Sequence, residues 1–471
     1  MNRDEVLRCA EGVLDKGIFF DTLARRVAYP TESQNPARAG EIRHFLTDEM
    51  IPFLESLGFE ARILENPAVP RHPFLLGRRV EDAARPTVLI YGHGDVVWGM
   101  EDRWDEGLSP WRLTKRGDRW YGRGAADNKG QISVNLAALA CLLEVRGKLG
   151  FNVTVLIETG EEMGSPGLRE ICEREKESLR ADVLIASDGP RVNPRRATLY
   201  GGSRGVFNFD LVVKLREGAH HSGNWGGLLA NPGVILANAI AALIDGKGRI
   251  LVDDLKPDGI PDAVRAAIRR LQLPKDSEPS IDTWWGEPGL TPEEKVYGWN
   301  TLEVLAISCG DPENPVHAIP PEAWARCHMR FVKGSDPANF LQAIQRHLRE
   351  RGFENVEVRE VRESRYAATR MEPNDPWVEW AMGSIMRTTE VPADFLPNLG
   401  GSIPNDVFAD VLGLPTLWIP HSYAGCSQHA PNEHLLVSIV REGLRVMAGL
   451  FWDLAEEGGL VSRRNSPRSE T

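Results

Sequence analysis

The sequence lacks the marks of a disulfide-stabilised secreted protein and of a membrane protein. Its six cysteines include no close pair such as Cys-x-x-Cys, and cysteines spaced in this way are typical of reduced, mostly buried thiols. The first residues, MNRDEVLRCAEGVLDKG, place acidic residues among apolar ones, so we expect neither a signal peptide nor a membrane anchor. These absences predict a cytoplasmic protein without a disulfide framework and without a membrane partner.

Clustered positive charge is also scarce. The formal net charge is −12, and the one basic cluster is the short stretch RRNSPR near the C-terminus. Nucleic-acid binding needs a clustered basic surface that neutralises phosphates, so we expect no nucleic-acid partner. Low-complexity stretches and internal repeats are absent as well, and residues 461–471 have the composition of a disordered tail.

The rest of the chain has an ordinary globular composition, but its 471 residues are too many for one domain core, so we expect two lobes. Four apolar runs typical of buried strands each lead to polar residues: TVLIYGHGD, NVTVLIETGEE, ADVLIASD and GLPTLWIPHSYAGCSQH. Helical stretches such as GQISVNLAALACLLEVRG lie between them. This alternation predicts an α/β domain with a mostly parallel central sheet covered on both faces.

The middle of the chain follows a different pattern. Residues 206–215, VFNFDLVVKL, alternate apolar and polar side chains as a half-exposed antiparallel strand does, and TLEVLAISCG and AWARCHMRFV are suitable partners. We therefore predict an inserted α+β domain at residues 199–365. The catalytic domain would then comprise residues 1–198 and 366–460.

In a parallel sheet, ligands bind at the carboxyl ends of the strands, so the polar ends of the four runs should meet. A pair of divalent metal ions needs about three protein ligands each, with one ligand shared. His93 and Asp188 can serve one metal ion, Glu162 and His429 the other, and Asp127 in YGRGAADNKG can bridge them. Each motif alone is commonly a surface turn, and their coincidence at strand ends favours a metal site.

Two further carboxylates complete this hypothesis. Asp95 follows His93 by two residues and could orient its imidazole. Glu161 directly precedes Glu162. If one glutamate of the doublet binds metal, the other can act as the general base toward the metal-bound water, so a single turn supplies both a ligand and a base.

The motifs GHGDVV, YGRGAADNKG, ETGEEMGS, ASDG, HHSGNWGG, NLGGSIP and SQHAPNEH, in this order, resemble the carnosinase-like branch of the zinc metallopeptidases. This family also contains aminoacylases, acetylornithine deacetylases and glutamate carboxypeptidases. The resemblance extends from about residue 30 to about residue 455. It implies the same residues in the same roles as the positions at the strand ends predict. Glu161 would be the general base and Asp95 the partner of His93, and the metal ligands would be His93, Asp127, Glu162, Asp188 and His429.

The resemblance also implies roles that composition cannot show. The inserted domain would be a lid and dimerisation domain of a homodimer, in which His221 of HHSG holds the developing oxyanion in the partner subunit's site. Arg330 of HMRFV would clamp a substrate carboxylate, a task suited to a guanidinium. Gly401 and Ser402 of GGSIP match further contacts to that carboxylate, and His317 matches a hydrogen-bonding position of the lid.

By the same resemblance, the protein would be a metallopeptidase or amidohydrolase with two Zn²⁺ ions per subunit, which Mn²⁺ or Co²⁺ could replace. A water molecule bridging the ions would attack the amide carbonyl of a small carboxylate-bearing substrate, a dipeptide or an N-acyl amino acid. Carnosinase-type dipeptidases usually carry a charged pair before GGSIP, whereas this chain has Asn398 and Leu399. The lost acid favours an N-acyl amino acid over a substrate with a free ammonium group.

Three alternatives stay open at this point. The same activated water could deaminate a substrate instead of hydrolysing an amide. The stretch GGSRG around Ser203 fits the Gly-x-Ser-x-Gly pattern of serine hydrolases, which requires a helix after the serine, but the sequence predicts a strand there. A non-catalytic metal-binding protein with the same fold would have no use for Glu161.

Overall fold

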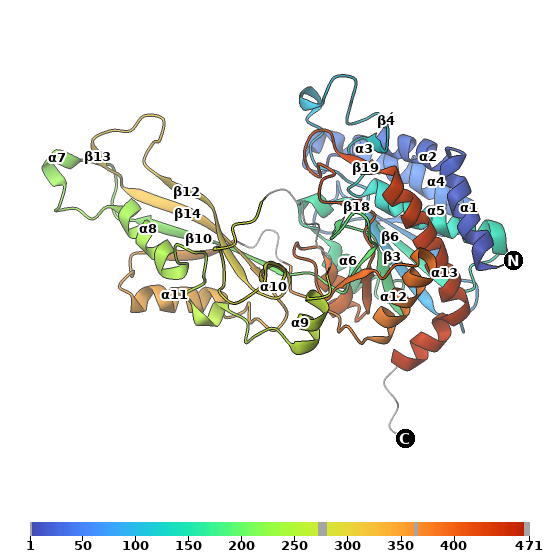
Figure 1. Ribbon diagram of the computed structural model, residues 1–471. Coiled ribbons are helices and arrows are strands. Elements are labelled where there is room, and N and C mark those ends of the chain that lie inside the picture. Colours follow the sequence, from blue (N-terminus) through green and yellow to red (C-terminus); the bar gives the residue numbers. More distant parts are fainter. Residues whose placement is uncertain (1, 272–279, 362–365, 466–471) are drawn as a thin grey trace.

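The computed structural model describes residues 2–271, 280–361 and 366–465 (Figure 1). The chain forms a larger body from its N-terminal and C-terminal segments and a smaller, elongated body from its middle, as the blue and red colours against the green and yellow ones show (Figure 1). Across the described residues, no helix combines the length and the apolar character that a membrane span needs.

The larger body is built on a mixed sheet with the strand order β1-β2-β6-β3-β7-β17-β9-β16 among the described residues. The strands are β1 (Glu60–Leu64), β2 (Phe74–Arg79), β3 (Thr87–His93), β6 (Asn152–Glu158), β7 (Val183–Ala186), β9 (Thr198–Tyr200), β16 (Asp394–Leu396) and β17 (Thr416–Trp418). The four central strands β6, β3, β7 and β17 are parallel, as predicted. Strands β1 and β2 at one side are antiparallel, and β17 pairs with β9 in antiparallel fashion.

Helices cover both faces of this sheet, which explains the unbroken apolar runs of its central strands. Val88 and Ile90 of β3 face a core formed with helices such as α1, α5 and α13, whereas Leu89 and Tyr91 face a second core with α6. The helices of the larger body are α1 (Arg3–Asp15), α2 (Ile18–Val27), α3 (Ala39–His44), α4 (Ile51–Ser56), α5 (Lys129–Arg146), α6 (Leu168–Arg174), α12 (Pro376–Thr389) and α13 (Val437–Asn465).

The end of the chain differs from the sequence prediction. Helix α13 continues to Asn465, past the point at residue 461 where we expected a disordered tail to begin. The reason is that Val461 is buried, at 8% exposure, in the same core as the other apolar residues of α13. Residues 466–471 of the expected tail lie outside the described residues.

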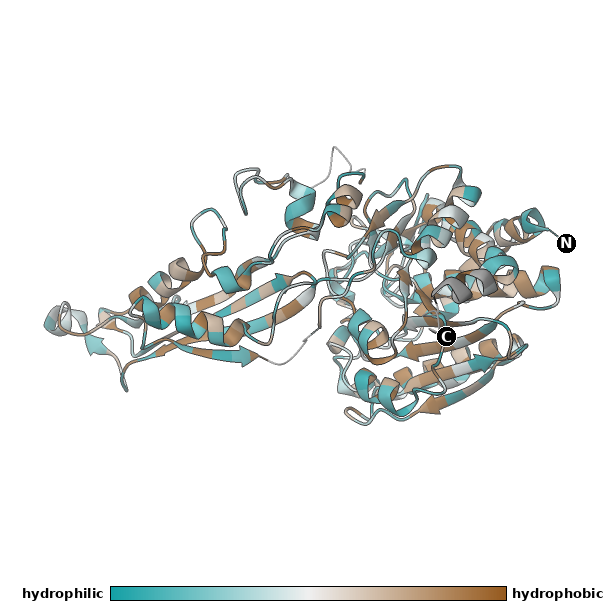
Figure 2. Cartoon of the chain, turned by 90° about the horizontal axis from the view of Figure 1, so that it is seen from below, coloured by the Kyte–Doolittle hydropathy of each residue, from teal (hydrophilic) through white to brown (hydrophobic). Residues whose placement is uncertain are grey.

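The smaller body contains an antiparallel sheet with the order β12-β14-β10-β15. Its strands are β10 (Gly205–Lys214), β12 (Thr301–Cys309), β14 (Glu322–Phe331) and β15 (Glu357–Val361). Helices α8 (Pro232–Leu243) and α11 (Phe340–Glu350) cover one face, and their apolar residues share a core with alternate residues of β10 and β14. Figure 2 shows the matching alternation of hydrophobic and hydrophilic residues along these strands.

The far tip of the smaller body carries β11 (His220–His221), α7 (Ser222–Trp225) and β13 (Ala318–Ile319) (Figure 1). Helices α9 (Asp262–Ile268) and α10 (Pro292–Tyr297) lie at the other end, next to the larger body (Figure 1). Short strands complete the larger body: β4 (Thr114–Arg116), β5 (Arg119–Tyr121), β8 (Pro190–Arg191), β18 (Ser422–Tyr423) and β19 (His434–Leu436).

Candidate metal centre

Neighbouring strands of the parallel centre deliver polar side chains to one edge of the sheet. Strand β3 ends at His93, which pairs with Glu158 at the end of β6. The short helix η4 (Glu161–Met163) follows β6 and contains the glutamate doublet. Asp188 follows β7 by two residues. The sheet therefore places these groups together because the carboxyl ends of parallel strands meet at one edge.

His93, Asp127 and Asp188 form the first group of candidate metal ligands. The Nε2 atom of His93 lies 3.0 Å from Oδ1 of Asp127 and 3.7 Å from Oδ2 of Asp188. All three residues are buried, and one ligand atom of each lies within 4.8 Å of the others. This spacing of imidazole and carboxylate atoms suits a single divalent cation.

Asp127, Glu162 and His429 form a second group, in which Asp127 takes part again. The Nε2 atom of His429 lies 3.0 Å from Oδ2 of Asp127 and 3.0 Å from Oε2 of Glu162. The two oxygens of Asp127 thus face different histidines, His93 on one side and His429 on the other. A carboxylate in this position can bridge two cations.

A buried network holds Asp127 in place. The peptide bond between Asp127 and Asn128 is cis. The carboxylate oxygen Oε1 of Glu433 accepts hydrogen bonds from the main-chain N–H groups of Ala126 and Asp127, at 2.9 and 3.0 Å. Its other oxygen pairs with Nη1 of Arg123 at 2.8 Å. The loop that carries His429 is therefore tied to the loop that carries Asp127.

Our sequence reasoning missed Glu433 and Arg123. Both side chains are 1% exposed in their ion pair, and burial of this kind cannot be read from a polar motif. The available signal was that Glu433 stands inside SQHAPNEH and Arg123 inside YGRGAADNKG, two motifs already singled out.

The carboxylate of Asp95 contacts both glutamates of the doublet as well as His93. Its Oδ1 accepts a hydrogen bond from the main-chain N–H of Glu161 and its Oδ2 one from that of Glu162, both at 3.2 Å. Its Oδ1 also lies 3.4 Å from Nδ1 of His93. A fully buried carboxylate therefore connects the strand end that carries His93 with the turn that carries both glutamates.

Burial and mutual repulsion raise the pKa values of three of the candidate site's acids, whereas hydrogen bonds to His429 and His93 outweigh burial at Asp127 and lower its pKa. Burial raises the pKa of Glu161 well above its ordinary value, that of Glu162 to about 7 and that of Asp188 to about 6. Hydrogen bonds to Asp127 and then to Glu162 raise the pKa of His429 to about 11. So many buried acids at one point are unfavourable unless cations neutralise them, and this donor set of carboxylates and imidazoles fits two divalent metal ions.

The structure also brings together the predicted carboxylate-binding residues Arg330, Gly401 and Ser402. Arg330 lies near the end of β14, and its Nη1 donates to Oγ of Ser402 at 2.6 Å. That hydroxyl donates in turn to the main-chain oxygen of Arg204 at 2.5 Å. Burial lowers the pKa of Arg330, which still leaves its guanidinium charged at neutral pH.

Tyr366 connects this arginine with the candidate metal centre, and sequence reasoning missed it. Burial raises the pKa of Tyr366 well above its ordinary value, and the negative charge of Glu161 raises it further. The same tyrosine acts electrostatically on Arg330. It stands in the chain where the smaller body returns to the larger one, a position without a motif that would have indicated it.

His221 and His317 do not join the other predicted site residues. Both are exposed at the far tip of the smaller body, in β11 and directly before β13 (Figure 1). The main-chain oxygen of His317 accepts hydrogen bonds from N and Oγ of Ser222, at 2.9 and 3.0 Å. Within one chain, these histidines are therefore separated from the candidate metal ligands by the length of the smaller body.

The serine-hydrolase alternative does not fit the structure. Ser203 is fully buried, and its hydroxyl lies 3.4 Å from the main-chain oxygen of Ile403. Strand β10 begins at Gly205, where a nucleophile elbow would need a helix. Ser203 is a buried residue in an isolated β-bridge with Leu399.

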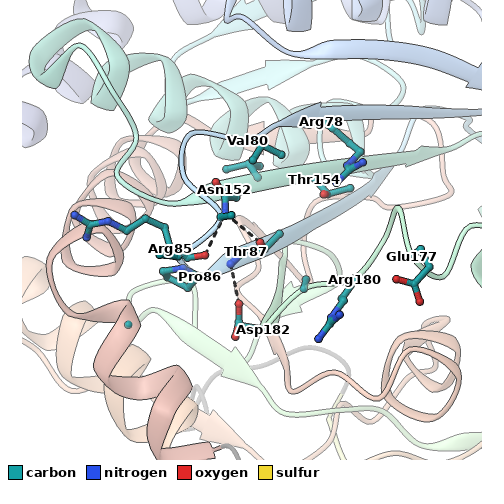
Figure 3. A pocket seen from close by; sticks show the side chains of 15 residues that line it. Arg78, Val80, Arg85, Pro86, Thr87, Asn152, Thr154, Glu177, Arg180 and Asp182 are labelled. Atoms are coloured by element: carbon teal, nitrogen blue, oxygen red, sulfur yellow. Dashed lines mark hydrogen bonds between the residues drawn. The ribbon is translucent and has the colours of Figure 1, made fainter.

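A large hollow of about 640 Å³ lies away from the candidate metal centre (Figure 3). It includes Thr87 and Asn152, which begin strands β3 and β6, whereas the candidate ligands follow the opposite ends of these strands. Asp182 accepts a hydrogen bond from the main-chain N–H of Thr87 there, at 2.8 Å. The hollow therefore lies at the opposite end of these strands from the candidate metal ligands.

Comparison with known proteins places the chain among metallopeptidases. The family model "Peptidase family M20/M25/M40" matches residues 89–453. The Beta-Ala-His dipeptidase of Rattus norvegicus is 26% identical over 407 residues, which cover 83% of this chain and 81% of the relative. A Cys-Gly metallodipeptidase of Candida albicans is 25% identical over 474 residues, which cover 92% of this chain and 93% of the relative.

Solved structures share the fold. An M20 family metallo-carboxypeptidase from Sulfolobus solfataricus superimposes with a TM-score of 0.78 at 23% identity, covering 93% of this chain and 99% of the other. Human carnosine dipeptidase 1 superimposes with a TM-score of 0.76 at 22% identity, covering 97% of this chain and all (100%) of the other.

Proposed function

The chain belongs to peptidase family M20/M25/M40 and is a metallopeptidase, and on this premise we propose that it hydrolyses the amide bond of a dipeptide or an N-acyl amino acid. The observation that carries the proposal is the position of Asp127 in both groups of candidate ligands, with Glu161 beside them and in neither group. The similarity to dipeptidases supports a peptide-like substrate.

His93, Asp127 and Asp188 would hold one cation, and Asp127, Glu162 and His429 the other. When bound, the cations would lower the pKa of a water molecule and polarise the substrate carbonyl. We propose zinc, and the mixed carboxylate and imidazole donors could also accept manganese or cobalt.

Glu161 is the proposed general base. It would take a proton from the attacking water and deliver it to the leaving amine. Its location supports this role, since its main chain is held by Asp95 while its half-buried side chain lies among the charges of His93, Glu162 and Asp188. The surrounding acids and the burial raise its pKa, which is the direction that a proton-accepting carboxylate at neutral pH requires.

Arg330 would bind the free carboxylate of the substrate, with Ser402 and the main chain of Gly401 beside it. The guanidinium offers several N–H donors in one plane, and Nη1 is already directed at the hydroxyl of Ser402 at 2.6 Å. Tyr366 lies within electrostatic reach of both Arg330 and Glu161, which supports a location of the carboxylate site near the reacting group.

The acyl side of the substrate would be apolar or neutral. Leu399 stands close to Gly189, which follows Asp188, because a Cβ atom at Gly189 would lie 3.5 Å from Cδ2 of Leu399. The neighbouring Asn398 donates its side-chain amide to the main-chain oxygen of Tyr297 at 3.0 Å and is buried. Neither side chain offers a negative charge to a substrate ammonium group, which supports N-acyl amino acids over dipeptides with a free ammonium group.

We also propose that the protein acts as a homodimer in which the lid of one subunit completes the site of the other. His221 is exposed at the tip of the smaller body, far along the molecule from the metal ligands of its own chain (Figure 1). A second subunit could bring an equivalent histidine to the oxyanion position. A cytoplasmic location is in keeping with six cysteines that are all free.

The test is release of amine from a panel of dipeptides, N-acyl amino acids and amides without a carboxylate, on enzyme loaded with zinc or manganese. Glu161→Ala serves as the blank, and Leu399→Glu tests the acyl side. We expect turnover of carboxylate-bearing amides that is lost in Glu161→Ala, and a shift toward dipeptides with a free ammonium group in Leu399→Glu. Turnover that persists in Glu161→Ala would contradict the mechanism, and unchanged ratios in Leu399→Glu would contradict the substrate assignment.

A further inference from the structure

A second cavity, of about 570 Å³, lies in the smaller body beside α10 and apart from the candidate metal ligands. Its lining is largely apolar and includes Ile250, Leu290 and Val296 together with the indole rings of Trp285 and Trp299. A cavity of this size and character is typical of a site for a small molecule. Aromatic walls in particular suit a ligand with a large apolar side chain.

Arg204 brings a buried positive charge to this cavity. Its side chain is largely enclosed, with the residue 8% exposed, and its Nε donates to the main-chain oxygen of Gly400 at 2.7 Å. Its Nη1 is buried and has no hydrogen-bond partner within the part of the chain that the structure describes. Arg204 is a largely enclosed cation that lines the cavity and leaves one N–H group unpaired, so its charge favours an anionic group in the cavity beside it.

Glu303 is one of three acidic residues that line the same cavity, with Asp282 and Glu287, and Lys295 adds a second cation. Glu303 stands on β12, is exposed, and lines the cavity together with Arg204. The two charges influence each other electrostatically, and no hydrogen bond between the two side chains is present among the described residues. A guanidinium and a carboxylate that share a cavity without touching can each receive the opposite charge of a zwitterion.

We propose that this cavity binds a free α-amino acid with a large apolar side chain. The carboxylate of the ligand accepts hydrogen bonds from Arg204, its ammonium group faces Glu303, and its side chain lies against Trp285 and Trp299. A simple carboxylic acid would not use the charge of Glu303, and an uncharged apolar ligand would not use the charge of Arg204. Amino acids of this kind would be products of the proposed hydrolysis. The identification of the ligand as a product rests on the proposed function, whereas the binding site does not.

The cavity is coupled to the substrate-binding residues through Arg204. The main-chain oxygen of Arg204 accepts the hydrogen bond of Ser402, and its side chain holds Gly400. Val296 of the cavity wall packs so closely on Gly400 that an added Cβ would lie 2.7 Å from its Cγ1 atom. A ligand in the cavity therefore contacts the same residues that position the carboxylate clamp.

The experiment is equilibrium dialysis of labelled L-phenylalanine against the full-length, metal-loaded Arg330→Met variant, in which the clamp can no longer bind a product carboxylate. We expect one bound L-phenylalanine per subunit. Trp285→Ala and Glu303→Gln should each weaken this binding at least tenfold. Trp284→Ala is the matched control, because Trp284 is exposed, neighbours Trp285 and does not line the cavity, so its affinity should equal that of the parent.

Two analogues test the zwitterion directly. N-acetyl-L-phenylalanine lacks the ammonium group and phenethylamine lacks the carboxylate, so each should bind at least tenfold more weakly than L-phenylalanine. Absence of binding in Arg330→Met, equal binding in Trp285→Ala and Glu303→Gln, or equal binding of the analogues would overturn the proposal. Trp285 and Glu303 are both partly exposed, so thermal unfolding can verify that the two variants are folded. The experiment measures binding and not turnover, so its result would remain valid even if the protein were not a hydrolase.

Discussion

At the scale of single residues, the two glutamates of the doublet have different surroundings. Glu162 directs Oε2 to Nε2 of His429 at 3.0 Å, within one group of candidate ligands, whereas Glu161 belongs to neither group. Two adjacent side chains of a tight turn point in different directions, so one can face a metal ion while the other faces the substrate.

This difference predicts two distinct phenotypes. Glu161→Gln should retain two metal ions per subunit and lose about 10²–10⁴-fold in kcat, because only the proton acceptor is gone. Glu162→Gln should lose one metal ion per subunit and activity together. Metal analysis after dialysis, alongside kcat, distinguishes the two variants, and loss of metal from Glu161→Gln would assign it as a ligand instead.

His421 predicts a pH-dependent stability at the same scale. It is 2% exposed, and burial, followed by the charge of Arg191, lowers its pKa well below the ordinary value. The folded protein therefore keeps it neutral, while the unfolded chain binds a proton below about pH 6.5. The stability that it contributes is present above that pH and is lost as the pH falls, at up to about 1.4 kcal/mol per pH unit.

Urea unfolding of wild type and His421→Asn between pH 7.5 and 5 tests this expectation. The free energy of unfolding of the wild type should fall more steeply with decreasing pH than that of the variant, by the equivalent of one proton. Equal slopes would show that the folded state also protonates His421.

At the scale of elements, the contact between β3 and α5 sets the position of the Asp127 loop. Gly92 of β3 lies so close to α5 that an added Cβ would be 2.9 Å from Cβ of Ile132 and 3.0 Å from Oδ1 of Asn128. The absence of a side chain at Gly92 therefore lets the helix begin directly after the bridging carboxylate.

Gly92→Ala should destabilise the fold by about 1–3 kcal/mol through overpacking and should weaken metal binding as well. Gly383→Ala in α12 is the matched control, because a Cβ there meets nothing closer than 3.9 Å, and it should gain up to about 1 kcal/mol from helix propensity. Urea unfolding and metal titration of both variants check this prediction. If Gly92→Ala left the free energy of unfolding and the metal affinity unchanged, the close packing of Gly92 against α5 would be contradicted.

At the scale of the whole molecule, the separation of His221 from the metal ligands predicts complementation between subunits. Glu161→Ala and His221→Ala should each be nearly inactive alone. Mixed after subunit exchange, half of the dimers would be hybrids with one competent site each, which gives about a quarter of wild-type activity for a twofold dimer. Activity that stays at the level of the single variants, with exchange verified by differently tagged subunits, would place His221 outside the partner's site.

The family, the layered α/β fold and the parallel centre of the sheet could be predicted because they depend on patterns between neighbouring residues. The apolar run before His93 and the doublet after Glu158 are local signals, and parallel strands align such ends by geometry. The short strands β1 and β9 carried no comparable signal, since three to five residues are too few for a periodic pattern. The roles of the individual site residues stay predictions until the variants are measured.

The sequence by itself determined which residues stand at the strand ends, because each follows its own apolar run within a few positions. Only the tertiary structure decided how these residues are held and what lies beside them. Arg123 and Glu433 are 310 positions apart in the chain and meet as a buried pair beneath Asp127. Arg204 keeps an unpaired N–H beside a cavity whose other walls come from residues 248–250 and 280–303. Such burial and pairing are properties of distant segments packed together, and no local pattern of residue types encodes them.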